Sequence, residues 1–285
     1  MNTNSSGLFT VIGAQGFMGR HLVSALRSQG KECFAPERDD PTVFQQSLGH
    51  VIYCAGVTSD FRQRPFDTMK AHVCLAGEFL EKAAFDSFVY VSSTRIYMDN
   101  ITSNEQVSLL VNPHHRDHLF HLSKLAGESL CLNSGRKNVK IARVSNVCGD
   151  DYNSGNFLYS LIHDAVDKKH ITLHTTLDTA KDYIGIDDVV RLLISIAQAD
   201  GSGVYNVASG INTSNRSISQ WIRELTGCQV SVADDARTVC FPLIDVTRIH
   251  NEMGYENPDS EALIRGLIAE CTEELKRQGL GKAGG

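Results

Sequence analysis

Three glycines near the start of the chain have the spacing of a phosphate-binding turn. Gly13, Gly16 and Gly19 lie between a short apolar run, 8–12, and a segment with helical spacing of apolar residues, 17–29. In such a turn one glycine permits the tight bend, a second lets backbone N–H groups approach a pyrophosphate, and the third allows close helix packing. The helix N-terminus then directs its positive dipole end at the phosphates. The turn predicts a dinucleotide site formed by Gly13, Gln15, Gly16, Phe17, Met18 and Gly19.

Two charged residues follow the second predicted strand, where the ribose of such a cofactor would be bound. Glu37 and Arg38 stand side by side about 20 residues after the glycine turn. Glu37 would accept hydrogen bonds from a 2′-hydroxyl and repel a 2′-phosphate, whereas Arg38 would attract that phosphate or stack on adenine. The pair leaves NAD and NADP both open, with NAD slightly favoured.

Strand and helix patterns alternate through the first half of the chain. Apolar runs predict strands at 8–12, 33–35, 51–55, 88–91 and 139–144. Helical periodicity predicts helices at 17–29, 66–84 and 117–134, and the stretch 38–49 has room for one brief helix. This alternation implies βαβ crossovers and a parallel sheet with both faces covered. The predicted fold class is α/β, a Rossmann-type doubly wound parallel sheet.

Beyond residue 146 the alternation becomes less regular. The patterns there predict a turn at 179–182, a strand at 204–207, and helices at 157–168, 186–199, 217–226 and 260–278, followed by a frayed tail. We therefore expect a smaller, discontinuous C-terminal substrate lobe. The dinucleotide-binding domain is predicted to take residues 1–145 and 185–210, and the lobe residues 146–184 and 211–285.

The composition is typical of a globular protein that binds neither nucleic acid nor membrane. The 285 residues carry a formal net charge of −6, which argues against nucleic acid as the main partner. No apolar run approaches the roughly 18–20 residues that span a bilayer, and the polar N-terminus lacks the regions of a signal peptide. The eight cysteines are scattered without a C-x-x-C pair. We expect a reduced, cytoplasmic protein.

Motifs along nearly the whole chain resemble those of the extended short-chain dehydrogenase/reductases. The resemblance is to the NAD-dependent epimerase/dehydratase family, whose members mostly act on nucleotide sugars. Besides the glycine turn it rests on Val51–Gly56, Val91–Tyr97, Ser123–Glu128, Arg143–Val147, Lys181–Asp188 and Tyr205–Gly210. One such motif alone would be weak, but their combination is specific.

The resemblance implies roles for individual residues. Ser93 matches the family's active-site Ser/Thr, which hydrogen-bonds the reacting sugar oxygen, and Lys124 matches the lysine that binds the nicotinamide ribose. Further cofactor contacts are implied for Cys54, Ala55, Gly56, Val91 and Val147. Substrate contacts are implied for Arg95, Asn146, Asn156, Phe157, Lys181 and Arg237. The family needs no metal, so we expect none despite the H-x-x-H spacings among His115, His118 and His121.

One position departs from the family's Tyr-x-x-x-Lys signature. The residue four before Lys124 is Phe120, which lacks the hydroxyl, so the family's usual general acid/base is absent. Three explanations stay open: an introduced substitution, a different acid/base such as His121 or Tyr97, or binding without turnover.

Two smaller departures concern neighbouring motifs. Ser93 is followed by Thr94 and Arg95, where the family's dehydratases usually carry Asp-Glu, and this argues against 4,6-dehydration. His72 stands where the family usually has Asn.

These observations favour an NAD(P)-dependent nucleotide-sugar epimerase, in which hydride is abstracted and returned through a 4-keto intermediate. A nucleotide-4-keto-sugar reductase is the first alternative, and a non-catalytic NAD(P)-binding sensor or scaffold is an alternative of another class. By analogy with the family we also expect a homodimer, paired through the helix at 66–84, and a place in polysaccharide biosynthesis.

Overall fold

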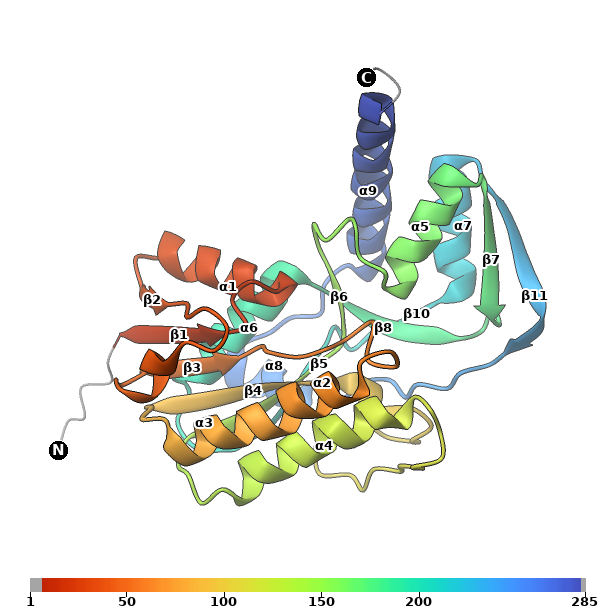
Figure 1. The fold of residues 1–285 in the computed structure, drawn as a ribbon. Helices are drawn as coiled ribbons and strands as arrows, with labels where there is room; N and C mark the ends of the chain where they lie inside the picture. The colour runs from red at the N-terminus through yellow and green to blue at the C-terminus, as the bar shows by residue number, and fades with distance from the viewer. Residues whose placement is uncertain (1–6, 283–285) are drawn as a thin grey trace.

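A six-stranded parallel sheet forms the centre of the protein in the computed structural model, which describes residues 7–282 (Figure 1). Its strands, in spatial order, are β2 (Glu32–Phe34), β1 (Leu8–Ile12), β3 (His50–Tyr53), β4 (Ser87–Ser93), β5 (Val139–Val144) and β9 (Gly203–Val207). The residues of β3 and β5 are buried throughout, as expected for apolar strands covered on both faces. The strand order reverses at β1, so β1 and β3 diverge at the point where doubly wound folds bind ligands. The predicted α/β class is confirmed.

Helices cover both faces of this sheet. On one face lie α1 (Phe17–Ser28) and α6 (Ile186–Gln198), which pack on each other; on the other lie α2 (Pro65–Met69), α3 (Ala76–Lys82) and α4 (His118–Asn133) (Figure 1). Between α2 and α3, residues Lys70–Leu75 form a π-helical turn inside the helix predicted at 66–84. The hydroxyls of Tyr53 and Tyr90 donate to the carbonyls of Ala71 and His72 in this turn. The sheet thereby holds the widened turn against its carboxyl edge.

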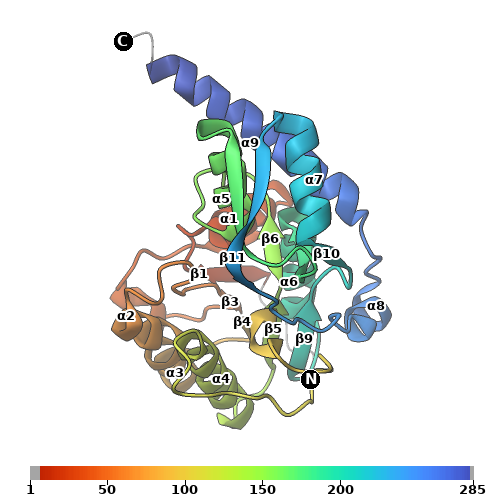
Figure 2. The ribbon, with the colours of Figure 1, turned by 90° about the vertical axis from the view of Figure 1, so that its right-hand side faces the viewer.

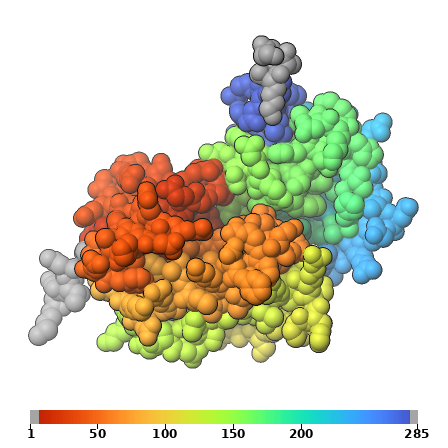
Figure 3. All heavy atoms as spheres, in the orientation of Figure 1, coloured from red at the N-terminus to blue at the C-terminus, as the bar shows by residue number. Residues whose placement is uncertain are grey.

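The remaining elements form a second group with its own apolar core. Three helices, α5 (Phe157–Asp167), α7 (Asn215–Thr226) and α9 (Ser260–Lys282), pack together beside the strand pair β7 (His170–Thr175) and β11 (Gln229–Arg237) (Figure 2). A small sheet of β6 (Asn146–Cys148), β8 (Ala180–Gly185) and β10 (Asn212–Ser214) connects this group to the main sheet. In Figure 3 the green and blue segments of this group gather beside the red-to-yellow N-terminal part. None of the described helices is long and apolar enough to cross a membrane.

The structure differs from the sequence prediction in two places. The turn predicted at 179–182 is wrong, because this stretch enters β8, where the buried Asp182 accepts hydrogen bonds from Ser145, Ser209, Gly210 and Ile211. The other difference is a set of elements that were not predicted, the strands β6, β7, β10 and β11 and the helix at Thr247–Met253.

The domain division stays a prediction, and the structure qualifies its last segment. The helix α8 (Thr247–Met253) lies in the stretch predicted for the lobe, yet it packs against β9 and α6. Ile244, Val246 and Ile249 belong to the same apolar core as α1 and α6. The segment around α8 therefore packs on the main sheet, and the chain leaves that sheet again before α9 begins.

Candidate active site

The larger of two adjoining cavities, about 960 Å³ in volume, lies at the carboxyl ends of β1, β2 and β3. Its walls include eight of the predicted cofactor-binding residues: Gly13, Gln15, Gly16, Glu37, Arg38, Cys54, Ala55 and Gly56. They come from three segments that are separate in sequence. The parallel sheet brings them together because each segment follows the carboxyl end of a strand.

The glycine turn leaves no space for side chains. Gly13 has a φ of +86°, and a Cβ there would lie 2.8 Å from the backbone nitrogen of Ala55. A Cβ on Gly19 would lie 2.7 Å from the Cα of Ala14, so α1 packs directly under the turn. Gly16 precedes the first turn of α1 and lines the cavity. This cradle fits a pyrophosphate, which would meet backbone N–H groups at the start of a 12-residue helix.

The other predicted residues of the turn point elsewhere. Phe17, Met18 and Gly19 form the first turn of α1 and do not line the cavity. The ring of Phe17 packs beside Gly149, where an added Cβ would lie 2.8 Å from its Cζ. Val147, also predicted to contact the cofactor, pairs with Ile184 between β6 and β8.

Lys124 and Val91, both predicted to contact the cofactor, line neither of the two cavities, but Lys124 lies directly behind Gly56 in the wall of the larger one. Its ammonium donates to the carbonyl of Val91, 2.9 Å away, and a Cβ on Gly56 would lie 3.6 Å from its Nζ. Burial lowers the pKa of Lys124 to about 8. Lys124 thus reaches the end of β4 from α4, and the carbonyl of the predicted Val91 is its acceptor.

His72 is fixed beside Lys124 as a neutral imidazole. Its Nε2 accepts from the backbone N–H of Val57 at 3.1 Å, so its Nδ1 carries the proton and donates to Ser123 Oγ at 2.8 Å. Ser123 in turn donates to the carbonyl of Phe120. Burial, with the charge of Lys124, lowers the pKa of His72 to about 2. With both ring nitrogens engaged, His72 holds the loop after β3 against α4, and its one N–H is already donated to Ser123.

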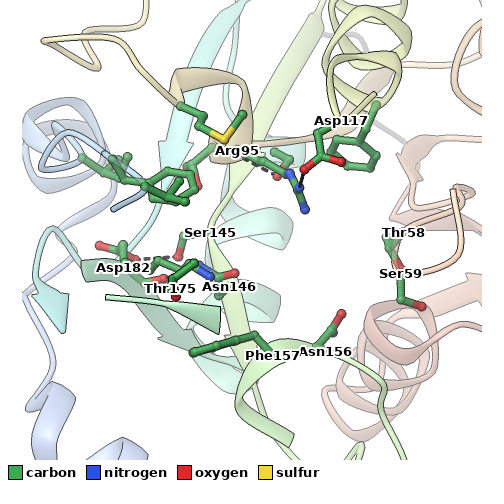
Figure 4. A pocket seen from close by; sticks show the side chains of 18 of the residues that line it. Thr58, Ser59, Arg95, Asp117, Ser145, Asn146, Asn156, Phe157, Thr175 and Asp182 are labelled. Atoms are coloured by element: carbon green, nitrogen blue, oxygen red, sulfur yellow. Dashed lines mark hydrogen bonds and ion pairs between the residues drawn. The ribbon is translucent and has the colours of Figure 1, made fainter. Parts of the chain in front are cut away.

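A smaller cavity of about 440 Å³ adjoins the larger one, since consecutive residues, Val57 and Thr58, line one cavity each. Seven predicted residues line it: Ser93, Arg95, Phe120, Asn146, Asn156, Phe157 and Lys181 (Figure 4). They come from β4, α4, β6, α5, β8 and the loops beside them. Arg237 is exposed in β11 and does not line this cavity.

Ser93 and Lys181 lie on different walls of the smaller cavity. Ser93 Oγ accepts from the backbone N–H of Arg95, which leaves the hydroxyl hydrogen able to donate to a ligand. Lys181 Nζ lies 4.2 Å from the centre of the Phe157 ring. Burial, with the charge of Arg95, lowers the pKa of Lys181 to about 8. A hydrogen-bond donor and a cation therefore face the same space.

Phe120 sits in an aromatic environment at the junction of the two cavities. Its ring centre lies 5.4 Å from that of Phe61 and 5.5 Å from that of His72. Lys124 Nζ lies 6.0 Å from the same ring centre. The side chain is placed one helical turn from Lys124, as the signature requires, but it offers only carbon and hydrogen to a ligand.

Neither alternative acid/base considered from the sequence lines a cavity. The hydroxyl of Tyr97 donates to Asn206 and accepts from Arg143, and burial raises its pKa to about 12. His121 is fully buried, and burial lowers its pKa to about 3. Among the residues whose side chains the structure describes, 7–279, no His and no Tyr lines the smaller cavity. Its two carboxylates are occupied, Asp117 by Arg62 and Arg95, and Asp182 by five donated hydrogen bonds.

The sequence analysis missed several lining residues of the smaller cavity. Thr58, Ser59, Phe61 and Arg62 follow the carboxyl end of β3, which was a usable signal because ligands bind at that edge. Asp117, Thr175, Asn212, Val239, Phe241 and Pro242 also line it, and no local pattern marks them.

Comparison with known families decides the relationship that the motifs and the geometry suggest. The model of the NAD dependent epimerase/dehydratase family matches residues 9–208. The chain belongs to this family. Comparison with curated protein sequences finds no match.

Solved structures show the same fold at low sequence identity. MoeE5 in complex with UDP-glucuronic acid and NAD is 21% identical, with a TM-score of 0.80 over 94% of this chain and 99% of that chain. RMD from Pseudomonas aeruginosa, complexed with NADPH, is 19% identical, with a TM-score of 0.72 over 93% and 99%. A Tyr-to-Phe mutant of UDP-glucuronic acid 4-epimerase from Bacillus cereus is 16% identical, with a TM-score of 0.75 over 94% and 99%. The expected doubly wound architecture thus extends over nearly the whole chain.

Proposed function

We propose that this protein binds NAD(P) in the larger cavity and a nucleotide sugar in the smaller one, as a 4-epimerase whose proton transfer is prevented by Phe120. One observation carries the proposal. Ser93 and Phe120 line the smaller cavity, Lys124 Nζ lies 6.0 Å from the centre of the Phe120 ring, and of these three only Phe120 lacks the group that the reaction needs.

The larger cavity would hold the cofactor through backbone and charge. The turn at Gly13 and Gly16 would bind the pyrophosphate, Glu37 and Arg38 the adenosine ribose, and Lys124 the nicotinamide ribose. A nicotinamide dinucleotide, when bound, supplies hydride transfer. Glu37 at the end of β2 slightly favours NAD over NADP.

The smaller cavity would orient the nucleotide sugar. Lys181 and Asn146 would contact its diphosphate or sugar, and Asn156 with Phe157 its base. The Ser93 hydroxyl would donate to the reacting sugar oxygen. The same oxygen must also lose its proton when the carbon is oxidised, and that proton has no acceptor at position 120. Loss of such a group commonly costs about 10²–10⁴ in rate.

Two other functions remain candidates. A nucleotide-4-keto-sugar reductase would use the same residues but consume reduced cofactor. A non-catalytic sensor or scaffold is favoured by one observation, the lack of His and Tyr among the described residues that line the smaller cavity. The homodimer, the cytoplasmic location and the role in polysaccharide biosynthesis stay predictions.

The test compares the protein with its Phe120→Tyr and Phe66→Tyr variants. Each would be incubated with UDP-, GDP-, CDP- and dTDP-sugars in the presence of NAD, and separately with nucleotide-4-keto sugars in the presence of NADH or NADPH, and the products followed by proton NMR. We expect Phe120→Tyr to raise turnover by about 10²–10⁴, because it restores the missing proton acceptor. Phe66 is 88% exposed on α2, so a hydroxyl there should change nothing.

The outcomes separate the three functions. A new sugar epimer formed without net change in NAD supports the epimerase. Product that appears only from a 4-keto sugar, with stoichiometric loss of NADH or NADPH, supports the reductase. If neither the original chain nor Phe120→Tyr turns over any sugar although both bind the cofactor, the sensor or scaffold is favoured. Equal turnover by the original chain and Phe120→Tyr would show that another group carries the proton.

A further inference from the structure

Two arginines share one carboxylate on a wall of the smaller cavity. Arg62 contacts Asp117 Oδ1 at 2.6 Å through its guanidinium, and Arg95 contacts Oδ2 of the same carboxylate at 3.2 Å. All three side chains line the cavity, and Figure 4 shows Arg95 beside Asp117. One carboxylate balances only one guanidinium, so this wall carries an uncompensated positive charge in a protein whose net charge is −6.

Arg95 also keeps donors unused. Its Nε is buried and has no hydrogen-bond partner among the described residues. A buried donor without a partner is unfavourable, so a rotation of the Arg95 guanidinium that brings Nε–H to an incoming acceptor would be favoured. A guanidinium can present Nε–H and a terminal N–H side by side, the geometry that matches the two oxygens of a carboxylate.

The position of Arg95 relates this charge to the reaction centre. Arg95 is two residues beyond Ser93, and its backbone N–H donates to Ser93 Oγ. Its guanidinium carbon lies 5.5 Å from the centre of the Phe61 ring, which in turn lies 5.4 Å from that of Phe120. A ligand group bound by Arg95 would therefore lie on the same side of the cavity as Ser93, Phe61 and Phe120, where the sugar is proposed to bind.

A second cation marks a different wall. Lys181 Nζ lies over the ring of Phe157, and in Figure 4 Phe157 lies across the cavity from Arg95. The charge of Arg95 contributes to the lowered pKa of Lys181, which indicates that the two cations act on the same space. Among the described lining residues the remaining carboxylate, Asp182, is satisfied by five donated hydrogen bonds. The cavity thus suits a ligand with two separate anionic groups.

We propose that Arg95 binds a carboxylate on the sugar, so that the preferred ligand is a nucleotide-linked uronic acid and not a neutral hexose. This inference rests on the proposed function, since it assumes that a nucleotide sugar occupies the smaller cavity. Lys181 would then take the diphosphate, and Arg95 the acid group at the other end of the ligand. A neutral sugar would leave the Arg95 donor and the extra charge of this wall unmatched.

The test measures binding to the NAD-saturated protein by calorimetry. The probes are glucose and glucuronic acid linked to UDP, GDP, CDP or dTDP, together with each free nucleoside diphosphate. We expect the uronic acid form to bind about 10- to 100-fold more tightly than the matched glucose form. Arg95→Met should abolish this preference and leave the affinity for the free nucleoside diphosphate unchanged, whereas Arg95→Lys, which keeps the charge, should retain part of it.

The matched control is Arg277→Met, since Arg277 lies on α9, is 75% exposed and pairs with Glu274. It should keep the full preference. Equal binding of the two sugar forms by the original protein would overturn the inference while the proposed function stands. So would a preference that survives in a folded Arg95→Met variant. If no nucleotide sugar binds at all, the proposed function is wrong, and the inference falls with it.

Discussion

The two adjoining cavities differ in how much of their lining is backbone and how much is side chain. One part of the larger cavity is backbone, formed by the turn at Gly13 and the end of β3 with a helix packed directly beneath, while side chains such as Arg64 and Glu78 line other parts of it. The smaller cavity is lined by side chains from strands and helices of both groups of elements. A backbone-lined site accepts what any dinucleotide shares, whereas a side-chain-lined site can differ from one family member to the next. This explains how the protein keeps a complete glycine turn while it departs from the family at Phe120 and Arg95.

A buried polar network lies beside the segment of the smaller cavity that carries Ser93 and Arg95. In this network, Ser92 and Arg143 both donate to the carboxylate of Glu128, and the Arg143–Glu128 contact is 2.6 Å with both side chains nearly fully buried. Arg143 also donates to Tyr97, and Tyr97 donates to Asn206. This buried polar network connects α4, β4, β5 and β9, and it fixes the segment that carries Ser93 and Arg95.

The largest effect is expected where this network is broken. Glu128→Ala would leave the buried guanidinium of Arg143 without its counter-ion, and such losses cost about 3–5 kcal/mol. Urea unfolding would measure the change. Glu224→Ala provides the control, because Glu224 pairs with Arg265 at the surface and should alter the free energy of unfolding little. If both variants lose the same free energy of unfolding, the buried network stabilises the protein no more than a surface ion pair does.

A second, smaller effect is expected in the larger cavity. Gly13→Ala forces an L-residue into a positive φ, which costs about 1–3 kcal/mol, and its Cβ would press on Ala55 in the cavity wall. Gly30→Ala is the matched control, because Gly30 also has a positive φ, +70°, but nothing lies within 4 Å of an added Cβ. Both variants should lose stability, and only Gly13→Ala should lose NADH binding, followed by cofactor fluorescence. Retained binding would mean that the turn does not hold the pyrophosphate.

The same contrast explains what the sequence could predict. The glycine turn, the strand at 139–144 and five of the eight residues around the larger cavity follow from local patterns, because each depends on one strand and the residues just after it. The other three, Cys54, Ala55 and Gly56, came from the family resemblance. β8 could not be predicted from such local patterns. Its polar residues Lys181 and Asp182 are typical of a turn, and the partners that allow Asp182 to be buried in a strand, Ser145 and Ser209, come from distant segments.

Parts of the smaller cavity could be found only through the family. Its motifs led to Ser93, Asn146 and Lys181, which the structure brings to one cavity. Asp117 and Phe241 were missed because they enter it from loops with no pattern of their own. Tyr97 was considered as a proton carrier because it is near Ser93 in sequence, yet it belongs to the buried network. Nearness in sequence does not fix the direction of a side chain.

The third effect concerns Lys124, which lies behind Gly56. Burial lowers its pKa from an ordinary 10.5 to about 8, so between these values the unfolded chain holds a proton that the native protein has released. Stability must then rise with pH in this window, by up to about 1.4 kcal/mol per pH unit. Lys124→Met lacks this gain, while Lys140 and Lys181 titrate alike in both proteins. We therefore measure the free energy of unfolding in urea at pH 7, 8, 9 and 10. Relative to the variant, the free energy of unfolding of the original chain should rise only above pH 8. Parallel curves would mean that Lys124 keeps its ordinary pKa, and then its ammonium would cost the native protein nothing at neutral pH.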